Sequence, residues 1–70
     1  MTTEEKVARV REYIRLCEVA ATAFSKNLYY GYAAGMIQAW GSDYSLGYDN
    51  RTMLDRELQV ANLIKPKEEI

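Results

Sequence analysis

The sequence has no histidine, a single cysteine and a single proline, and these shortages exclude several classes of protein. Histidine is the commonest general base and a common metal ligand, and one thiol cannot form an intramolecular disulfide. Cys17 falls on the apolar side of a predicted helix, where a thiol is usually inert. A glycine-rich phosphate loop is also missing. We therefore expect no catalytic residues, no cofactor and no metal site, and hence no enzyme.

The chain also lacks an excess of charge of one sign and a long apolar run. Nine basic residues stand against ten acidic ones, for a net charge of −1, whereas nucleic-acid-binding domains usually have a basic face. A predicted third helix has Arg51 and Arg56 but also Asp55 and Glu57, which argues against a DNA-recognition helix. The uncharged run at residues 27–42 is shorter than the roughly 20 apolar residues that span a bilayer, and the N-terminus does not resemble a signal peptide. The sequence predicts a cytoplasmic protein with no membrane contact.

The apolar residues recur with the spacing of a helix at the start of the chain. Thr2 and Glu5 have the spacing of a capping box at a helix N-terminus. Residues 25–27 offer capping side chains, so we place a helix break there. The predicted buried stripe of the first helix steps by alternating three and four positions and extends to the start of the second. It consists of Val7, Val10, Ile14, Cys17, Ala21, Phe24 and Leu28.

These patterns predict an all-α fold of three helices at about residues 3–25, 28–41 and 51–64, in one helical domain of residues 1–65. The first two helices would form an antiparallel hairpin, with the third helix packed across it. Residues 41–50 are rich in turn formers and predict a loop, after which Asp49 or Asn50 would cap the third helix. Residues 66–70 predict a short, charged, frayed tail. The alternative is one continuous helix over residues 3–40, because residues 25–27 include neither glycine nor proline.

The second predicted helix indicates self-association. It has no polar face, and Gly31, Gly35 and Ala39 recur every four residues along one side. Two interior glycines destabilise a helix by about 2 kcal/mol relative to alanine, and the close approach of another helix would compensate for that loss. Since a chain of this size buries only about 60% of its unfolded surface, we expect a homo-oligomeric bundle. Gly31, Gly35 and Ala39 are its predicted oligomer interface.

The aromatic residues and two arginines are the candidates for binding a partner or a ligand. Tyrosine combines a large apolar ring with a polar tip, which suits interfaces, although packing within the core or between subunits explains such residues as well. Arg11 and Arg15 share a helix face and could hold a phosphate or a carboxylate, unless they pair with Glu12 and Glu18. The predicted binding residues are Tyr29, Tyr30, Tyr32, Trp40, Tyr44, Tyr48, Arg11 and Arg15.

The segment YYGYAAGMIQAW, preceded by a helix carrying REYIRLCEVA, resembles small helical proteins encoded by phages and prophages. The resemblance covers residues 5–42 and transfers no functional residue. Phage proteins of this kind include antagonists of host defence, and together with the missing catalytic residues the resemblance favours an inhibitor that binds a defence protein in the cytoplasm of a bacterial host. The alternatives are an oligomeric protein that binds or sequesters a nucleotide and a purely structural bundle. A pocket lined by arginines and tyrosines would favour the nucleotide, and a flat or convex aromatic patch would favour the protein partner.

Overall fold

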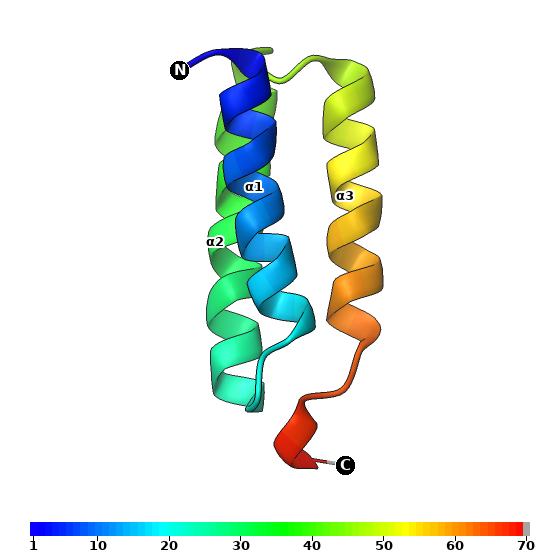
Figure 1. Cartoon of the computed structure of the whole chain (residues 1–70). Coiled ribbons are helices and arrows are strands. Elements are labelled where there is room, and N and C mark those ends of the chain that lie inside the picture. Colours follow the sequence, from blue (N-terminus) through cyan, green and yellow to red (C-terminus); the bar gives the residue numbers. More distant parts are fainter. Residues whose placement is uncertain (70) are drawn as a thin grey trace.

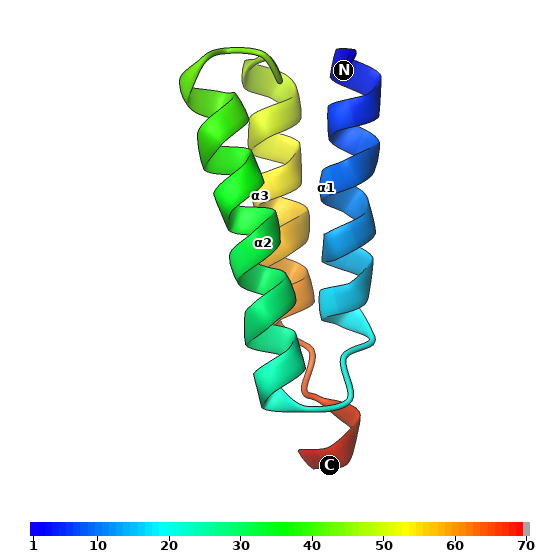
Figure 2. The same cartoon turned by 90° about the vertical axis from the view of Figure 1, so that its left-hand side faces the viewer.

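The computed structural model describes residues 1–69, which form three helices that all pack against one another (Figure 1). The helices are α1 (Thr3–Glu18), α2 (Ala23–Ser42) and α3 (Tyr48–Leu63), and a short 3-10 helix, η1 (Lys67–Glu69), follows them. α2 runs antiparallel to α1, and α3 runs antiparallel to α2 (Figures 1 and 2). The predicted three-helix, all-α architecture is confirmed for the described residues, which include no strand.

The first helix ends earlier than the sequence predicts. α1 begins with the predicted capping box of Thr2 and Glu5, and it ends at Glu18. α2 begins after Thr22, whose hydroxyl accepts a hydrogen bond from the backbone N–H of Ser25 at 3.0 Å. The chain therefore reverses at residues 19–22, and residues 25–27 lie in the first turn of α2. The predicted break at residues 25–27 is wrong because Thr22 provides the N-terminal cap, and the continuous helix over residues 3–40 is wrong for the same reason.

The earlier break changes which side chains face the core. Val10, Ile14 and Cys17 of the predicted stripe are buried in α1, as expected. Phe24 and Leu28 lie beyond the reversal, and their side chains are 79% and 43% exposed. The stripe is therefore correct within α1 and wrong in α2, because its later residues belong to a second helix with a different orientation.

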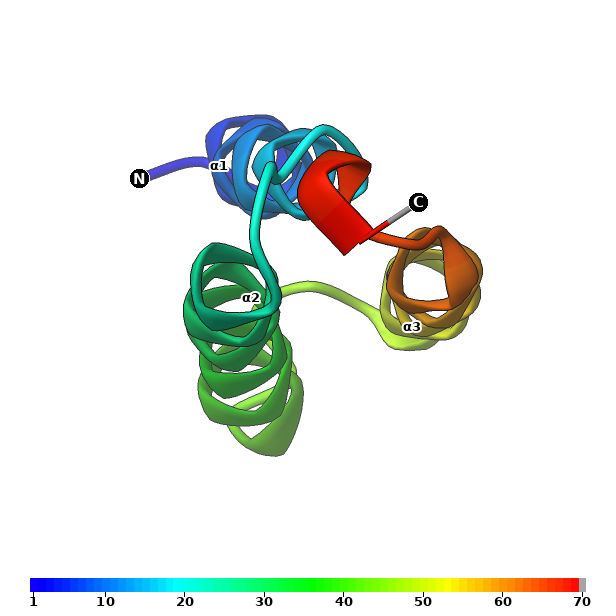
Figure 3. The same ribbon diagram turned by 90° about the horizontal axis from the view of Figure 1, so that it is seen from below.

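The hydrophobic core receives side chains from all three helices and from the turn between α2 and α3. An end-on view shows the three helices arranged around a common centre (Figure 3). Partly buried Tyr13, Tyr29, Tyr30 and Trp40 pack against this core. The buried cluster consists of Val10, Ile14, Cys17, Ala33, Ile37, Leu46, Leu54, Leu58 and Ala61.

The connection between α2 and α3 is shorter than predicted, because α2 continues to Ser42 and α3 begins at Tyr48. Gly47 is the N-cap of α3, with φ of +84° and no side-chain hydrogen bond. The expectation that Asp49 or Asn50 caps this helix is therefore wrong. Asn50 lies in the first turn, and its side chain donates a hydrogen bond to the carbonyl oxygen of Leu46 at 2.9 Å.

The segment after α3 folds back under the lower end of the bundle, where η1 lies beneath the α1–α2 reversal (Figures 1 and 2). The backbone N–H groups of Lys67 and Glu68 donate hydrogen bonds to the carbonyl oxygens of Ala20 and Ala21, at 3.4 and 2.9 Å. Pro66 is buried. The described part of the predicted frayed tail is thus bound to the bundle, and Ile70 lies outside the described residues.

Candidate interaction surfaces

One side of α2 faces away from both other helices and presents no charge. We call it the outer face of α2. Lys26 is the only charged residue of this helix, and its side chain is 6% exposed. The helix therefore offers an uncharged strip to any partner along its whole length. The outer face consists of the exposed residues Phe24, Asn27, Leu28, Gly31, Tyr32, Gly35, Gln38, Ala39 and Ser42.

Gly31 and Gly35 lie at the middle of the outer face, and nothing within the described chain requires glycine at either position. A Cβ atom on either residue would meet no atom within 4 Å. Gly41 differs, because a Cβ there would lie 2.8 Å from Cδ of Arg51, whose side chain crosses over it. Close packing inside the chain thus accounts for Gly41 but not for the two glycines of the outer face.

We expect Gly31→Ala and Gly35→Ala each to raise the free energy of unfolding by about 1 kcal/mol, because alanine is the better helix former and its methyl group has room. Urea unfolding at low micromolar concentration would measure the gain. Gly41→Ala is the matched control and should show no such gain, since the Arg51 side chain must move. A loss of stability at position 31 or 35 would contradict the expectation.

The predicted aromatic residues fall into two groups, and the first group packs against the core. Tyr29, Tyr30 and Trp40 are partly buried there. The Tyr30 hydroxyl accepts a hydrogen bond from Nε2 of Gln59 at 3.0 Å, and Lys6 places its ammonium 5.7 Å from the Trp40 ring centre. Since these contacts lie within the chain, the three residues link α2 to its neighbours.

Tyr32 marks the boundary between the packed aromatic residues and the outer face of α2. Its side chain is 51% exposed, and its ring centre lies 5.4 Å from that of Tyr13 on α1. Tyr13 also lies 6.4 Å from the ring of Tyr29. The sequence reasoning left Tyr13 out of the aromatic set because it is distant from the others along the chain.

The second aromatic group is a pair at the upper end of the bundle, Tyr44 and Tyr48, which we call the tyrosine pair. Their side chains are 87% and 82% exposed. Tyr44 has φ of +63°, in the left-handed region that favours glycine. The pair lines a cavity of about 70 Å³ together with Gly41, Gly47 and Arg51. Both rings therefore project from the fold rather than into it.

The two predicted arginines have different surroundings. Nε and Nη2 of Arg11 donate hydrogen bonds to the two carboxylate oxygens of Glu57 on α3, at 3.2 and 3.0 Å. These bonds raise the pKa of Arg11 above its usual value. Glu12, which the sequence suggested as a partner, lies instead 3.7 Å from Arg9. Arg15 is exposed near the end of α1, so the two arginines share a helix face but only Arg11 is bound to a carboxylate of another helix.

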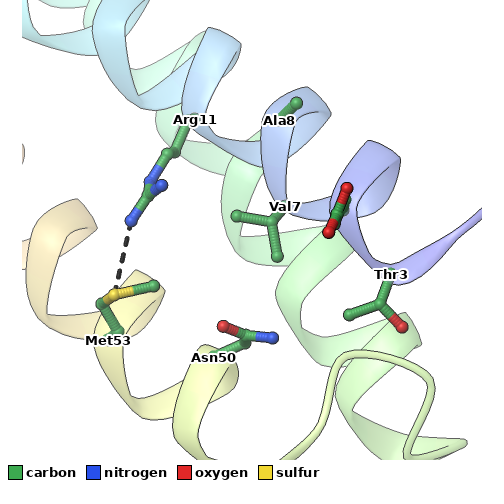
Figure 4. A pocket seen from close by; sticks show the side chains of 7 residues that line it. Thr3, Val7, Ala8, Arg11, Asn50 and Met53 are labelled. Carbon is green, nitrogen blue, oxygen red and sulfur yellow. Dashed lines mark hydrogen bonds between the residues drawn. The ribbon is translucent and has the colours of Figure 1, made fainter.

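A groove of about 520 Å³ lies between α1 and α3 (Figure 4). Val7 and Met53 give it an apolar floor, and Nη2 of Arg11 lies 3.3 Å from the sulfur of Met53. Its other lining residues are Thr3, Glu4, Ala8 and Asn50, so it contains no aromatic ring. The cavity at the tyrosine pair has arginine and tyrosine but is far below the roughly 300–1,000 Å³ of ligand pockets. Neither cavity therefore combines stacking, positive charge and space for a nucleotide.

Lys26 is the residue with an evident role that the sequence reasoning missed. Its ammonium donates hydrogen bonds to the carbonyl oxygens of Cys17 and Ala61, at 3.0 and 2.6 Å. These carbonyls belong to the last turns of α1 and α3, where a cation also offsets the negative end of the helix dipole. The sequence shows that Lys26 is the single charge in an otherwise uncharged segment. Because the predicted break at residues 25–27 placed Lys26 outside both helices, its structural role was not predicted. Its charge holds the fold together and is not available to a partner.

Within residues 1–69, no three histidine, cysteine, aspartate or glutamate side chains cluster as metal ligands would. Over the same residues, no helix has the length and apolar content that crossing a membrane requires. Comparison of the chain with models of protein families, with curated proteins and with solved structures gave no match in any of the three.

Proposed function

We propose that this chain is a non-enzymatic protein that acts by binding another protein, and that the tyrosine pair is its main contact. The observation that carries the proposal is the conformation of Tyr44. A left-handed conformation costs a residue with a side chain roughly 1–2 kcal/mol. The conformation ends α2, where the backbone N–H of Ser45 donates a hydrogen bond to the carbonyl oxygen of Trp40 at 3.0 Å. Glycine is the usual residue at such a position, and the tyrosine ring, which is 87% exposed, gains little from packing within the chain. Backbone strain of this kind is concentrated at functional sites.

The chemistry of the pair suits a protein partner. An exposed tyrosine contributes a large contact area, and only two side-chain torsions are immobilised on binding. Tyr44 lies in the turn and Tyr48 begins α3, and both rings are largely exposed. Rings that project in this way fit a concave site on a protein better than they enclose a small molecule. The resemblance of residues 5–42 to phage proteins makes a bacterial defence protein the first class of partner to test.

The outer face of α2 favours a second proposal, self-association of the chain through Gly31, Gly35 and Ala39. Its support is the uncharged, exposed strip with two glycines that no contact within the chain requires. The outer face does not include the tyrosine pair, which begins two residues beyond Ser42, its last member.

The proposed binding role is tested with Tyr44→Gly/Tyr48→Ala as the variant. Wild type and variant are immobilised and exposed to a bacterial lysate. We take as partner a protein that the wild type retains in a molar amount comparable to its own. The amount of that protein retained should be at least 10-fold lower on the variant, because an interface anchor contributes about 2 kcal/mol or more to binding. The helicity of the variant should be unchanged. Its unfolding should shift to higher urea concentration, because glycine adopts the positive φ of residue 44 without strain.

Leu63→Ala is the matched control, because Leu63 is as exposed as Tyr48 but lies at the far end of α3. It should retain the partner. Undiminished capture by the double variant would contradict the proposal. Loss of helicity in the double variant would also contradict it, since the two rings would then be packing residues.

A further inference from the structure

The absence of charge on the outer face of α2 restricts which surfaces can cover it. Lys26 is the only charged residue over Ala23–Ser42, and it is buried against two carbonyl oxygens. The exposed sides of α1 and α3 carry charges at closely spaced positions, such as Arg15 and Glu18 on α1 and Asp55 and Arg56 on α3. A charged surface placed on the outer face of α2 would lose hydration and gain no opposite charge. Within this chain, the matching uncharged surface is the outer face of α2 in a second copy.

Along the central line of the outer face, the side chains are bulky at the N-terminal end and small from the middle onward, and this asymmetry sets a direction. Its N-terminal half has bulky residues, its middle has two glycines, and its C-terminal half has small residues. In a parallel pair, the bulky halves would meet each other and hold the helices apart beside the glycines. In an antiparallel pair, each bulky half meets a small half, and the glycine segments can approach closely. The central line of the face runs Phe24, Leu28, Gly31, Gly35, Ala39 and Ser42.

We infer that two copies of the chain pair through α2 in the antiparallel direction, with Gly31 of each copy across from Gly35 of the other. In this register Leu28 lies within one residue, about 1.5 Å along the helix axis, of the position across from Ala39, and the bulky ring of Phe24 lies over the small end of the partner helix. The antiparallel direction also places the positive end of each helix dipole beside the negative end of the other. The inference rests on the proposed self-association and adds its direction and register.

The size of the face sets the strength of the pairing. A helix of 20 residues is about 30 Å long and roughly 10 Å wide, so its face offers on the order of 300 Å². Stable complexes bury about 800 Å² on each partner, and smaller interfaces belong to weak, reversible pairs. Tyr32, at the edge of the face, adds contact area on one side. The dimer should therefore form reversibly and depend on concentration.

Paired cysteines test the direction. Leu28→Cys and Ala39→Cys are prepared separately, mixed at high concentration and oxidised. The native Cys17 is buried and does not compete. The antiparallel register predicts a mixed disulfide between the two variants. It predicts little dimer from either variant alone, because identical positions would lie about 16 Å apart along the helix axis, beyond the roughly 7 Å between Cα atoms that a disulfide tolerates. Intact mass distinguishes the mixed disulfide from the symmetric ones.

The same experiment separates failure of the direction from failure of self-association. Sedimentation of the wild type from about 10 µM to 1 mM should show the mass rising from 8.1 kDa toward twice that value. Efficient disulfide formation by Leu28→Cys alone would show a parallel pair and overturn the inference while leaving self-association in place. A mass that stays at 8.1 kDa to 1 mM would overturn both.

Two controls complete the design. Gly35→Leu should remain helical, because a Cβ atom at this exposed position meets no atom of the chain within 4 Å. It should sediment as a monomer at every concentration, because the leucine side chain would hold the two copies apart. A mixture of Asn62→Cys with Ala39→Cys should form no mixed disulfide, since Asn62 is exposed on α3 rather than on the outer face of α2. Mixed disulfide in the control at the level of the Leu28 and Ala39 pair would mean random collision and overturn the inference.

Discussion

Replacing Lys26 by methionine is expected to lower the free energy of unfolding by about 2–4 kcal/mol. Methionine fills a similar volume but leaves the carbonyl oxygens of Cys17 and Ala61 without the ammonium that they now accept from. Each carbonyl keeps a backbone hydrogen bond, from the N–H groups of Ala20 and Ile64, so the loss is that of two hydrogen bonds to a charged donor. Each of these contributes about 1.5–3 kcal/mol, and the relieved desolvation of the ammonium offsets part of the total. A domain of this length has a stability of about 4–10 kcal/mol, so the variant should unfold at a much lower urea concentration.

Lys65→Met is the matched control, because Lys65 is exposed and follows α3. Its effect should be within about 0.5 kcal/mol. Lys26→Arg, which keeps a charged donor at the site, should be less damaging than Lys26→Met. Equal stability of wild type and Lys26→Met would contradict the role of the ammonium as a clamp between α1 and α3.

Replacing Leu46 by alanine is expected to cost about 3 kcal/mol, within the roughly 2–5 kcal/mol range of buried leucine truncations. Leu46 lies in the five-residue turn between α2 and α3, yet its side chain is 1% exposed and belongs to the core cluster. Its removal leaves a cavity beneath the turn that carries the tyrosine pair. Thermal and urea unfolding, followed by circular dichroism, would measure the loss.

Leu63→Ala serves as the control for Leu46→Ala as well, since the same chemical change is made at a side chain that is 82% exposed. We expect it to change stability by less than about 0.5 kcal/mol. A loss at position 46 no larger than at position 63 would show that the turn is not anchored by its leucine.

The helical nature of the chain was predictable because it depends on local spacing, whereas the position of the first reversal was not. Both Thr22 and residues 25–27 carry side chains that can cap a helix. The choice between them depends on contacts with distant parts of the chain. Lys26 must reach the carbonyl of Ala61, 35 residues away, and Glu68 must reach Ala21. A single sequence gives no direct sign of such pairs.

The candidate surfaces were predictable to a similar extent. Gly31 and Gly35 could be placed on one helix face from their spacing, and they do lie together on the outer face of α2. Which aromatic rings turn inward depends on the rotation of α2 relative to its neighbours, and the sequence does not specify that rotation. The partner of Arg11 is Glu57, 46 residues away, whereas the local spacing suggested glutamates on the same helix.

The shared ammonium of Lys26 has a consequence for the motions of the bundle. Helix ends normally open and close on their own, with little effect on one another. Here the last turns of α1 and α3 bind the same group, although they are separated from it by 9 and 35 residues of chain. Opening of either turn weakens the local order of the other, because the ammonium loses one of its two anchors. The lower ends of the three helices should therefore open as one cooperative unit.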